Sequence, residues 1–346
     1  MRLGGTRRSR RDLRTIALVA ALPLALAACS GGSPAGEPSG DSDQGWTPSR
    51  DVEWIVPYSP GGGFDIYSRG VAKVMESEGL LPDGVHIVIR NTTPLPQGLT
   101  QLFTADPDGQ TIGILPMPAA IAMEIQNPDI ARWTTSDYTI LGQVDENVYV
   151  VYVAADSPFQ SIDDLIAAKG MRTLATEEGS SADLATKATI AALGLDATNV
   201  YGMEGSAEIV AGALRGDAEF FVTGASDVVG YVESGDIRPL LVLSTEDQRP
   251  SDLEWLADVP TAESAGYPEL AGAVTELRVI VAPPELPEPV ATFWRDALED
   301  TLASDAFADW ATTAERPYVP RDAEATTASV QSQIERMQEL IPQLAD

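Results

Sequence analysis

The stretch VEWIVPYSPGGGFD, residues 52–65, joins an apolar run to a glycine-rich turn and then to the start of a helix. Residues 52–57 predict a buried strand because they are almost continuously apolar. Residues 65–77 predict a helix because their apolar side chains recur at spacings of three and four. A strand, a glycine turn and a helix in this order are typical of a parallel α/β sheet.

The rest of the chain repeats this alternation in two series. Two long apolar runs, residues 148–154 and 277–282, predict strands that carry the chain from a first series to a second and back again. We therefore predict two α/β lobes joined by two crossing strands that act as a hinge. The first lobe is expected to comprise residues 51–148 plus 275–346, and the second residues 149–274.

The first glycine turn has the chemistry of an anion site. Three successive glycines, Gly61, Gly62 and Gly63, leave their amides open at the start of a helix, where the helix dipole adds a partial positive charge. Asp65 is expected to cap that helix. The flanking residues Tyr58, Ser59 and Phe64 are candidates for contact with the rest of a ligand.

Similar turns recur in the second lobe, where small residues with free amides or hydroxyls follow a strand and open a helix. They are Gly179, Ser180, Ser181, Gly205, Ser206, Thr223, Gly224 and Ser226. In an α/β sheet, ligands bind outside the carboxyl ends of the strands. We therefore expect a cleft lined by neutral donors, which binds a carboxylate without any arginine.

The beginning of the chain reads as an export signal. Arginines crowd residues 2–14, and residues 16–28 form an apolar run too short to span a bilayer. The run ends at Cys29, the only cysteine of the chain, in a context that resembles the bacterial lipobox, which predicts lipidation of this thiol. Residues 1–28 are thus expected to be a signal peptide, and because Arg10 and Arg11 also resemble a twin-arginine signal, the Sec and twin-arginine export routes both stay open. Residues 29–50 form a flexible tether that anchors the protein outside the cytoplasmic membrane.

Composition excludes several functions. The formal net charge of −30 repels phosphate backbones, so we expect no nucleic-acid partner. One histidine and one cysteine exclude His/Cys metal sites, and we expect no metal and no cofactor. An esterase-like enzyme is the remote alternative, but no G-x-S-x-G elbow is present. Its base would be His86, which we expect to be a half-buried strand residue.

Several ordered motifs resemble the solute-binding proteins of tripartite tricarboxylate transporters, the Bordetella uptake (Bug) or TctC family. The resemblance covers roughly residues 52–342. Its matching segments are the first glycine loop with Pro57 and residues 60–65, the turn at 106–111, the strand at 235–240, and the segments at 258–268 and 281–287.

The resemblance implies a type II, Venus-flytrap periplasmic-binding-protein fold and no enzymatic activity. It implies a receptor, expected to be a monomer, that holds a small carboxylate between the lobes and delivers it to a large and a small membrane permease subunit. An extracytoplasmic sensor that feeds a signalling partner is the alternative, and neighbouring genes would separate the two.

Two positions depart from the pattern that the resemblance implies. Asp183 stands where the family often has histidine, and Glu204 stands where it often has lysine. If these acids face the cleft, each close like charge disfavours a trianion by about 1 kcal/mol or more. We therefore expect a monocarboxylate or dicarboxylate, or a carboxylate that carries an ammonium group, to bind better than citrate.

Overall fold

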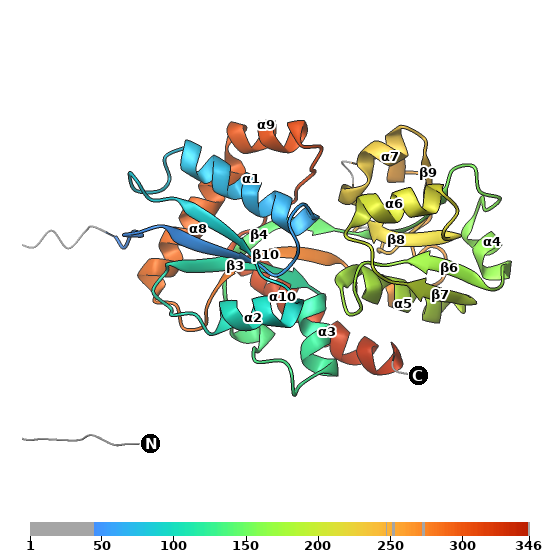
Figure 1. The fold of residues 1–346 in the computed structure, drawn as a ribbon, viewed down its shortest axis with the longest axis horizontal. Coiled ribbons are helices and arrows are strands. Elements are labelled where there is room, and N and C mark those ends of the chain that lie inside the picture. Colours follow the sequence, from blue (N-terminus) through green and yellow to red (C-terminus); the bar gives the residue numbers. More distant parts are fainter. Residues whose placement is uncertain (1–44, 247, 251–252, 272–273, 345–346) are drawn as a thin grey trace, which may run out of the picture. The chain divides into compact units, whose positions relative to one another are not determined.

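The computed structural model describes residues 45–346 except 247, 251–252, 272–273 and 345–346 (Figure 1). The signal peptide, the lipidation of Cys29 and most of the tether fall on residues outside the described part. Residues 45–346 form one compact unit with two separate five-stranded sheets. Within the described residues, no helix combines the length and the apolar character needed to cross a membrane.

The first sheet has the strand order β2-β1-β3-β10-β4. Strands β1, β2 and β3 are parallel, and β10 runs antiparallel to both of its neighbours. The bounds of these strands are Val52–Val56 (β1), Ile87–Asn91 (β2), Thr111–Met117 (β3), Thr139–Asn147 (β4) and Glu276–Ala282 (β10).

The second sheet has the strand order β7-β6-β8-β5-β9. Strands β6, β7 and β8 are parallel, and β5 runs antiparallel to both of its neighbours. The bounds of these strands are Tyr149–Ala154 (β5), Met171–Leu174 (β6), Ala197–Val200 (β7), Phe220–Gly224 (β8) and Ile237–Val242 (β9).

The two sheets share one topology. In each, the second strand in the order pairs in parallel with both of its neighbours, and the fourth strand runs antiparallel to the third and to the fifth. The chain passes from the first sheet to the second at Val148, between β4 and β5, and returns to the first sheet as β10. The predicted fold class, two α/β lobes of the type II periplasmic-binding-protein kind, is confirmed.

Helices cover both faces of the first sheet (Figure 1). Trp54 of β1 packs on the face of α1 and α8, whereas its neighbour Ile55 packs on the face of α2 and α10. Side chains of a strand alternate between faces, so this apolar strand is buried on both sides. The helices of this half are α1 (Gly63–Ser77), α2 (Leu95–Phe103), α3 (Ala119–Gln126), α8 (Glu288–Ala303), α9 (Asp305–Thr313) and α10 (Ala323–Leu340).

After β5, helices alternate with the strands of the second sheet along the sequence. They are α4 (Ile162–Ala167), α5 (Ser181–Leu193), α6 (Ser206–Leu214) and α7 (Val229–Glu233). In this half, α5 and α6 each follow a parallel strand, as α1 does in the first half. Each of these three helices therefore begins at the carboxyl end of a strand, the position where ligands of α/β sheets bind.

Candidate functional site

The amino termini of α1, α5 and α6 meet at one pocket with a volume of about 540 Å³. That volume lies within the usual range of small-molecule sites. Ten of the residues predicted from sequence line the pocket, and they come from both halves of the chain. They are Tyr58, Ser59, Gly62, Gly63, Phe64, Ser180, Ser181, Gly205, Ser206 and Thr223.

Five predicted residues do not line this pocket: Gly61, Asp65, Gly179, Gly224 and Ser226. Gly224 ends β8 and packs so closely on Asn147 that a Cβ there would lie 1.9 Å from Asn147 Nδ2. Ser226 is buried, and its amide donates to Asn147 Oδ1 at 3.0 Å. Both residues thus pack on Asn147, which in turn donates to the lining residue Asp227 at 3.2 Å.

Asp65 shapes the first loop rather than capping its helix. Gly62 occupies the N-cap position of α1, and no side chain caps this helix. Asp65 lies in the first turn and accepts hydrogen bonds from the amide of Gly61 (2.9 Å) and from Asn91 Nδ2 (2.9 Å), together with an ion pair from Arg69. Burial opposes ionisation, but these partners hold the pKa of the Asp65 carboxyl below its ordinary value. The expectation that Asp65 is the cap is therefore wrong.

The loop before α5 repeats this arrangement. Asp183 accepts from the amide of Gly179 (2.9 Å) and from Asn199 Nδ2 (2.9 Å), and Lys187 pairs with it at 3.0 Å. Gly61 and Gly179 have matching left-handed backbone conformations, with φ of 88° and 82°. Asp183 is fully buried beneath this loop and does not line the pocket, so it is not the cleft acid that the sequence comparison suggested.

The first loop leaves its next two amides open. The amide of Gly61 is occupied by Asp65, which corrects the expectation that all three glycine amides are free. In the described part of the chain, the amides of Gly62 and Gly63 donate to no protein acceptor. They stand at the positive end of the α1 dipole and line the pocket. They are therefore the donors of the first half that remain for a ligand anion.

Ser181 supplies a matching donor from the second half. It lines the pocket at the first position of α5, and its Oγ is buried without a well-formed hydrogen bond. Tyr58 lies close enough to Ser181 to be influenced by it, and its ring packs on Phe64 with centroids 5.0 Å apart. Burial and the facing carboxylates of Glu177 and Glu276 raise the pKa of the Tyr58 hydroxyl, so it stays protonated.

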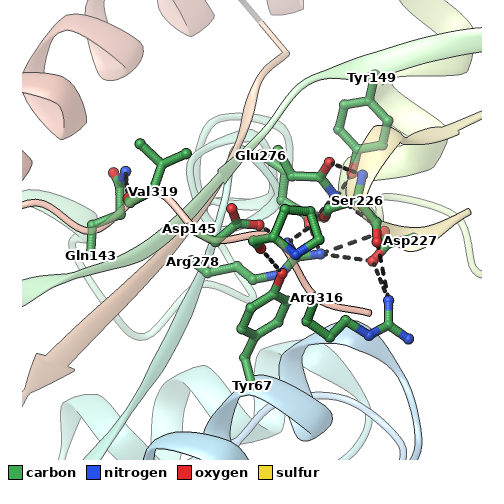
Figure 2. A network of polar contacts seen from close by, with 12 residues as sticks. Tyr67, Gln143, Asp145, Tyr149, Ser226, Asp227, Glu276, Arg278, Arg316 and Val319 are labelled. Carbon is green, nitrogen blue, oxygen red and sulfur yellow. Dashed lines mark hydrogen bonds and ion pairs between the residues drawn. The ribbon is translucent and has the colours of Figure 1, made fainter. Parts of the chain in front are cut away.

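The floor of the pocket contains a buried charge network that the sequence did not lead us to expect (Figure 2). Its centre is Arg278 of β10, which is 1% exposed. Asp145, Asp227 and Glu276 turn their carboxylates towards this guanidinium, with Glu276 Oε1 at 2.5 Å and Asp227 Oδ1 at 3.1 Å from Nη2. Arg316 also pairs with Asp227, at 3.5 Å.

The network holds more acid than base, and burial governs its ionisation. Burial raises the pKa of Asp145 to about 7, against the opposing effect of Arg278. Burial also raises the pKa of Glu276. Burial alone would lower the pKa of Arg278, but the three carboxylates raise it well above its ordinary value. Arg278 is therefore fully charged, and its charge is already neutralised by protein groups.

The pocket as a whole is acidic. Its charged lining residues are Arg278 and four acids, Glu177, Glu204, Asp227 and Glu276, a formal charge of −3. The expectation of a cleft lined only by neutral donors and without arginine is wrong. A signal was present in the sequence, because Glu276 and Arg278 stand two apart in an apolar strand and so share one face of it.

The histidine that the esterase-like alternative requires does not line this pocket. His86 lies just before β2, is exposed rather than half-buried, and contacts Glu76 at 3.3 Å instead of lining the pocket. Among the described residues, no group of three His, Cys, Asp or Glu side chains has the spacing to hold a metal ion.

Paired sheets of this topology, with helix amino termini around one pocket, define a solute-binding protein of the periplasmic-binding-protein class. A family model described as the tripartite tricarboxylate transporter family receptor matches residues 87–345. The chain therefore belongs to this family, TctC, and the resemblance seen in its sequence is confirmed. The family is one of solute receptors.

Known proteins agree with this assignment. Protein BugT of Bordetella pertussis (strain Tohama I) is 25% identical over 234 residues, which cover 65% of this chain and 69% of BugT. MatC from Rhodopseudomonas palustris, solved with bound malate, has a TM-score of 0.71 at 21% identity and covers 85% of this chain and 99% of MatC. An R. palustris protein solved with adipate has a TM-score of 0.72 at 20% identity, over 86% of this chain and 98% of that chain.

Proposed function

We propose that this receptor captures a small organic carboxylate outside the cytoplasmic membrane and delivers it to a tripartite transporter with a large and a small membrane subunit. The observation that carries the proposal is the convergence of three helix amino termini on one pocket. The open amides of Gly62 and Gly63 and the buried hydroxyl of Ser181 supply donors for one carboxylate group. The malate and adipate bound by proteins of the same fold support this ligand class.

The acidic residues that line the pocket disfavour a ligand with many carboxylate groups. Glu204 and Glu177 lie at the pocket in addition to the acids of its floor. Each close like charge costs a bound anion about 1 kcal/mol or more. We therefore propose that a monocarboxylate or dicarboxylate binds more tightly than citrate. Calorimetry in which citrate binds more tightly than both would contradict this preference.

A substitution at Gly62 tests the carboxylate site. The backbone of Gly62 is extended, with φ of −79° and ψ of 171°, and a Cβ there meets nothing closer than Ser59 O at 3.9 Å. Gly62→Val should therefore fold normally while its side chain fills the space beside the amide. In a thermal-shift screen of mono-, di- and tricarboxylates, we expect ligands that raise the melting temperature of the parent to have no effect on this variant.

The matched control is Gly45→Val, because Gly45 is equally open and does not line the pocket. It should respond to the ligands as the parent does. The proposed function is wrong if no carboxylate raises the melting temperature of the parent, or if Gly62→Val responds as strongly as Gly45→Val.

We further propose that Cys29 carries a lipid anchor and that the receptor works as a monomer. Replacement of Cys29 by serine should move the protein from the membrane fraction to the soluble extracytoplasmic fraction, measured by immunoblotting after fractionation. Retention of the Cys29→Ser variant in the membrane would refute the anchor, without bearing on ligand binding.

A further inference from the structure

The charge of the pocket identifies the ligand more closely than its helix termini do. Arg278 is the only cation among the residues that line it, and both of its terminal nitrogens are engaged by the protein. Nη1 contacts Asp145 and Ser226, and Nη2 contacts Asp227 and Glu276. The acids that line the pocket outnumber this cation, and Arg316 adds only a 3.5 Å pair with Asp227, so the lining presents a net negative charge to a ligand.

Glu276 is the most buried of the four acids that line the pocket. It lines the pocket although only 6% of its surface is exposed. Its Oε2 accepts from Tyr149 Oη at 2.8 Å, and its Oε1 contacts Arg278 at 2.5 Å and accepts from Asn147 Nδ2 at 3.5 Å. A carboxylate has about four acceptor positions, so further acceptor capacity remains. Glu177 also lines the pocket, at an exposed position.

We propose that the ligand is an amino carboxylate whose cationic nitrogen is held by Glu276, with Glu177 at the rim, while its carboxylate is held by Gly62, Gly63 and Ser181. This rests on the proposed function and specifies its substrate class. Ser181 points to a ligand independently of the acids, because its hydroxyl is buried at the pocket without a well-formed partner. A nitrogen cation at Glu276 forms a charge-assisted hydrogen bond and offsets the negative charge of the floor.

Calorimetry of the full chain, purified in detergent, tests this with pairs of ligands that differ only by the amino group. The pairs include glycine and acetate, 4-aminobutanoate and butanoate, and 6-aminohexanoate and hexanoate. Malate, adipate and succinate represent ligands without a cation. We expect at least one amino carboxylate to bind ten-fold or more tightly than its plain partner and than the dicarboxylates.

Variants then locate the cationic site. Glu276→Gln should weaken the preferred amino carboxylate ten-fold or more and change its plain partner less than three-fold. Should Glu276→Gln fail to fold, as judged by circular dichroism, Glu177→Gln decides, with an expected loss of three-fold or more for the amino carboxylate alone. The control is Glu178→Gln, since Glu178 follows Glu177 directly but does not line the pocket.

The outcomes separate this inference from the function on which it rests. If plain carboxylates bind as tightly as their amino partners in every pair, the amino-carboxylate inference is overturned and the carboxylate receptor stands. It is equally overturned if the deciding variant, Glu276→Gln or in its place Glu177→Gln, binds the amino carboxylate as the parent does. If no carboxylate of either kind binds, the proposed function and the inference both fail.

Discussion

Gly62 and Gly63 are adjacent glycines of the pocket that differ in the space around them. A Cβ on Gly62 meets no close atom, whereas one on Gly63 would lie 2.8 Å from Arg278 Nη2 and 3.1 Å from Asp227 Oδ1. Arg278 is fully buried and held by three carboxylates, so its guanidinium is unable to move aside. The absence of a side chain at Gly63 is therefore a packing requirement of the charge network.

These environments predict effects of alanine that differ in size. Gly63→Ala should lower the free energy of unfolding by about 1–3 kcal/mol, because the added methyl overpacks the network. Gly62→Ala should change that free energy by less than about 1 kcal/mol, because the freedom lost by the unfolded chain offsets the poorer capping of a helix by alanine. Urea denaturation measures both, and equal free energies for the two variants would count against the packing argument.

The sequence predicted the neutral part of the site better than its charged part. Glycine and serine after a strand have a local meaning, since they open a helix and expose its amides, and seven predicted glycines and serines line the pocket. Arg278, Glu276 and Asp145 were missed because their roles depend on pairing between strands far apart in the chain. A charged residue in an apolar strand shows that a partner exists, but it does not show which one.

At the scale of elements, the loops before α1 and α5 are built alike. Each has a left-handed glycine whose amide is bound by an aspartate four residues later, and each aspartate pairs with a cation a further four residues on. An asparagine on the neighbouring parallel strand completes both sets, Asn91 in β2 and Asn199 in β7. The repeat escaped notice in the sequence because it rests on four separated positions.

This arrangement predicts that Asp183 stabilises the second loop. It is fully buried and accepts from Gly179, Asn199 and Tyr201, so Asp183→Ala should lower the free energy of unfolding by about 2–3 kcal/mol. Lys187→Ala should cost about 1 kcal/mol or less, because the lysine is partly exposed. Chemical denaturation compares them, and a loss for Lys187→Ala equal to that for Asp183→Ala would show that the ion pair alone matters.

The element that sequence patterns missed is β4. Its residues TILGQVDEN include Gln143, Asp145 and Asn147, three polar side chains that are nevertheless buried. Tertiary partners hold them in place: the Gln143 amide nitrogen donates to the carbonyl of Val319 at 3.3 Å (Figure 2), and Asp145 pairs with Arg278. Apolar strands such as β1 and β5 are recognised from local composition, whereas a strand that is polar because it carries the charge network is not.

At the scale of the whole molecule, the charge network connects the two sheets. Asp145, Glu276 and Arg278 belong to β4 and β10 of the first sheet, whereas Asp227 follows β8 and Tyr149 begins β5 in the second. The contacts of Arg278 and Arg316 with Asp227 therefore cross between the halves next to the point where the chain itself passes between sheets. Movement of one half against the other must reorganise these pairs.

The same network predicts how the stability of the protein depends on pH. The pKa of Asp145 is raised by burial from its ordinary 3.8 to about 7, so between these values the folded state holds the proton more tightly than the unfolded chain. Stability therefore falls as pH rises through this window, and the free energy of unfolding should be lower at pH 8 than at pH 5. Glu276, whose pKa is also raised, adds to the same trend.

Asp145→Asn separates this residue from the remaining acidity of the chain. The amide keeps the shape of the protonated carboxyl and does not titrate, so the decrease in unfolding free energy between pH 5 and pH 8 should be smaller than in the parent. The matched control is Asp129→Asn, at an exposed position, which should retain the slope of the parent. Urea denaturation at several pH values measures the slopes. An Asp145→Asn slope equal to that of Asp129→Asn would mean that the folded protein keeps Asp145 ionised across this range, with Arg278 outweighing burial.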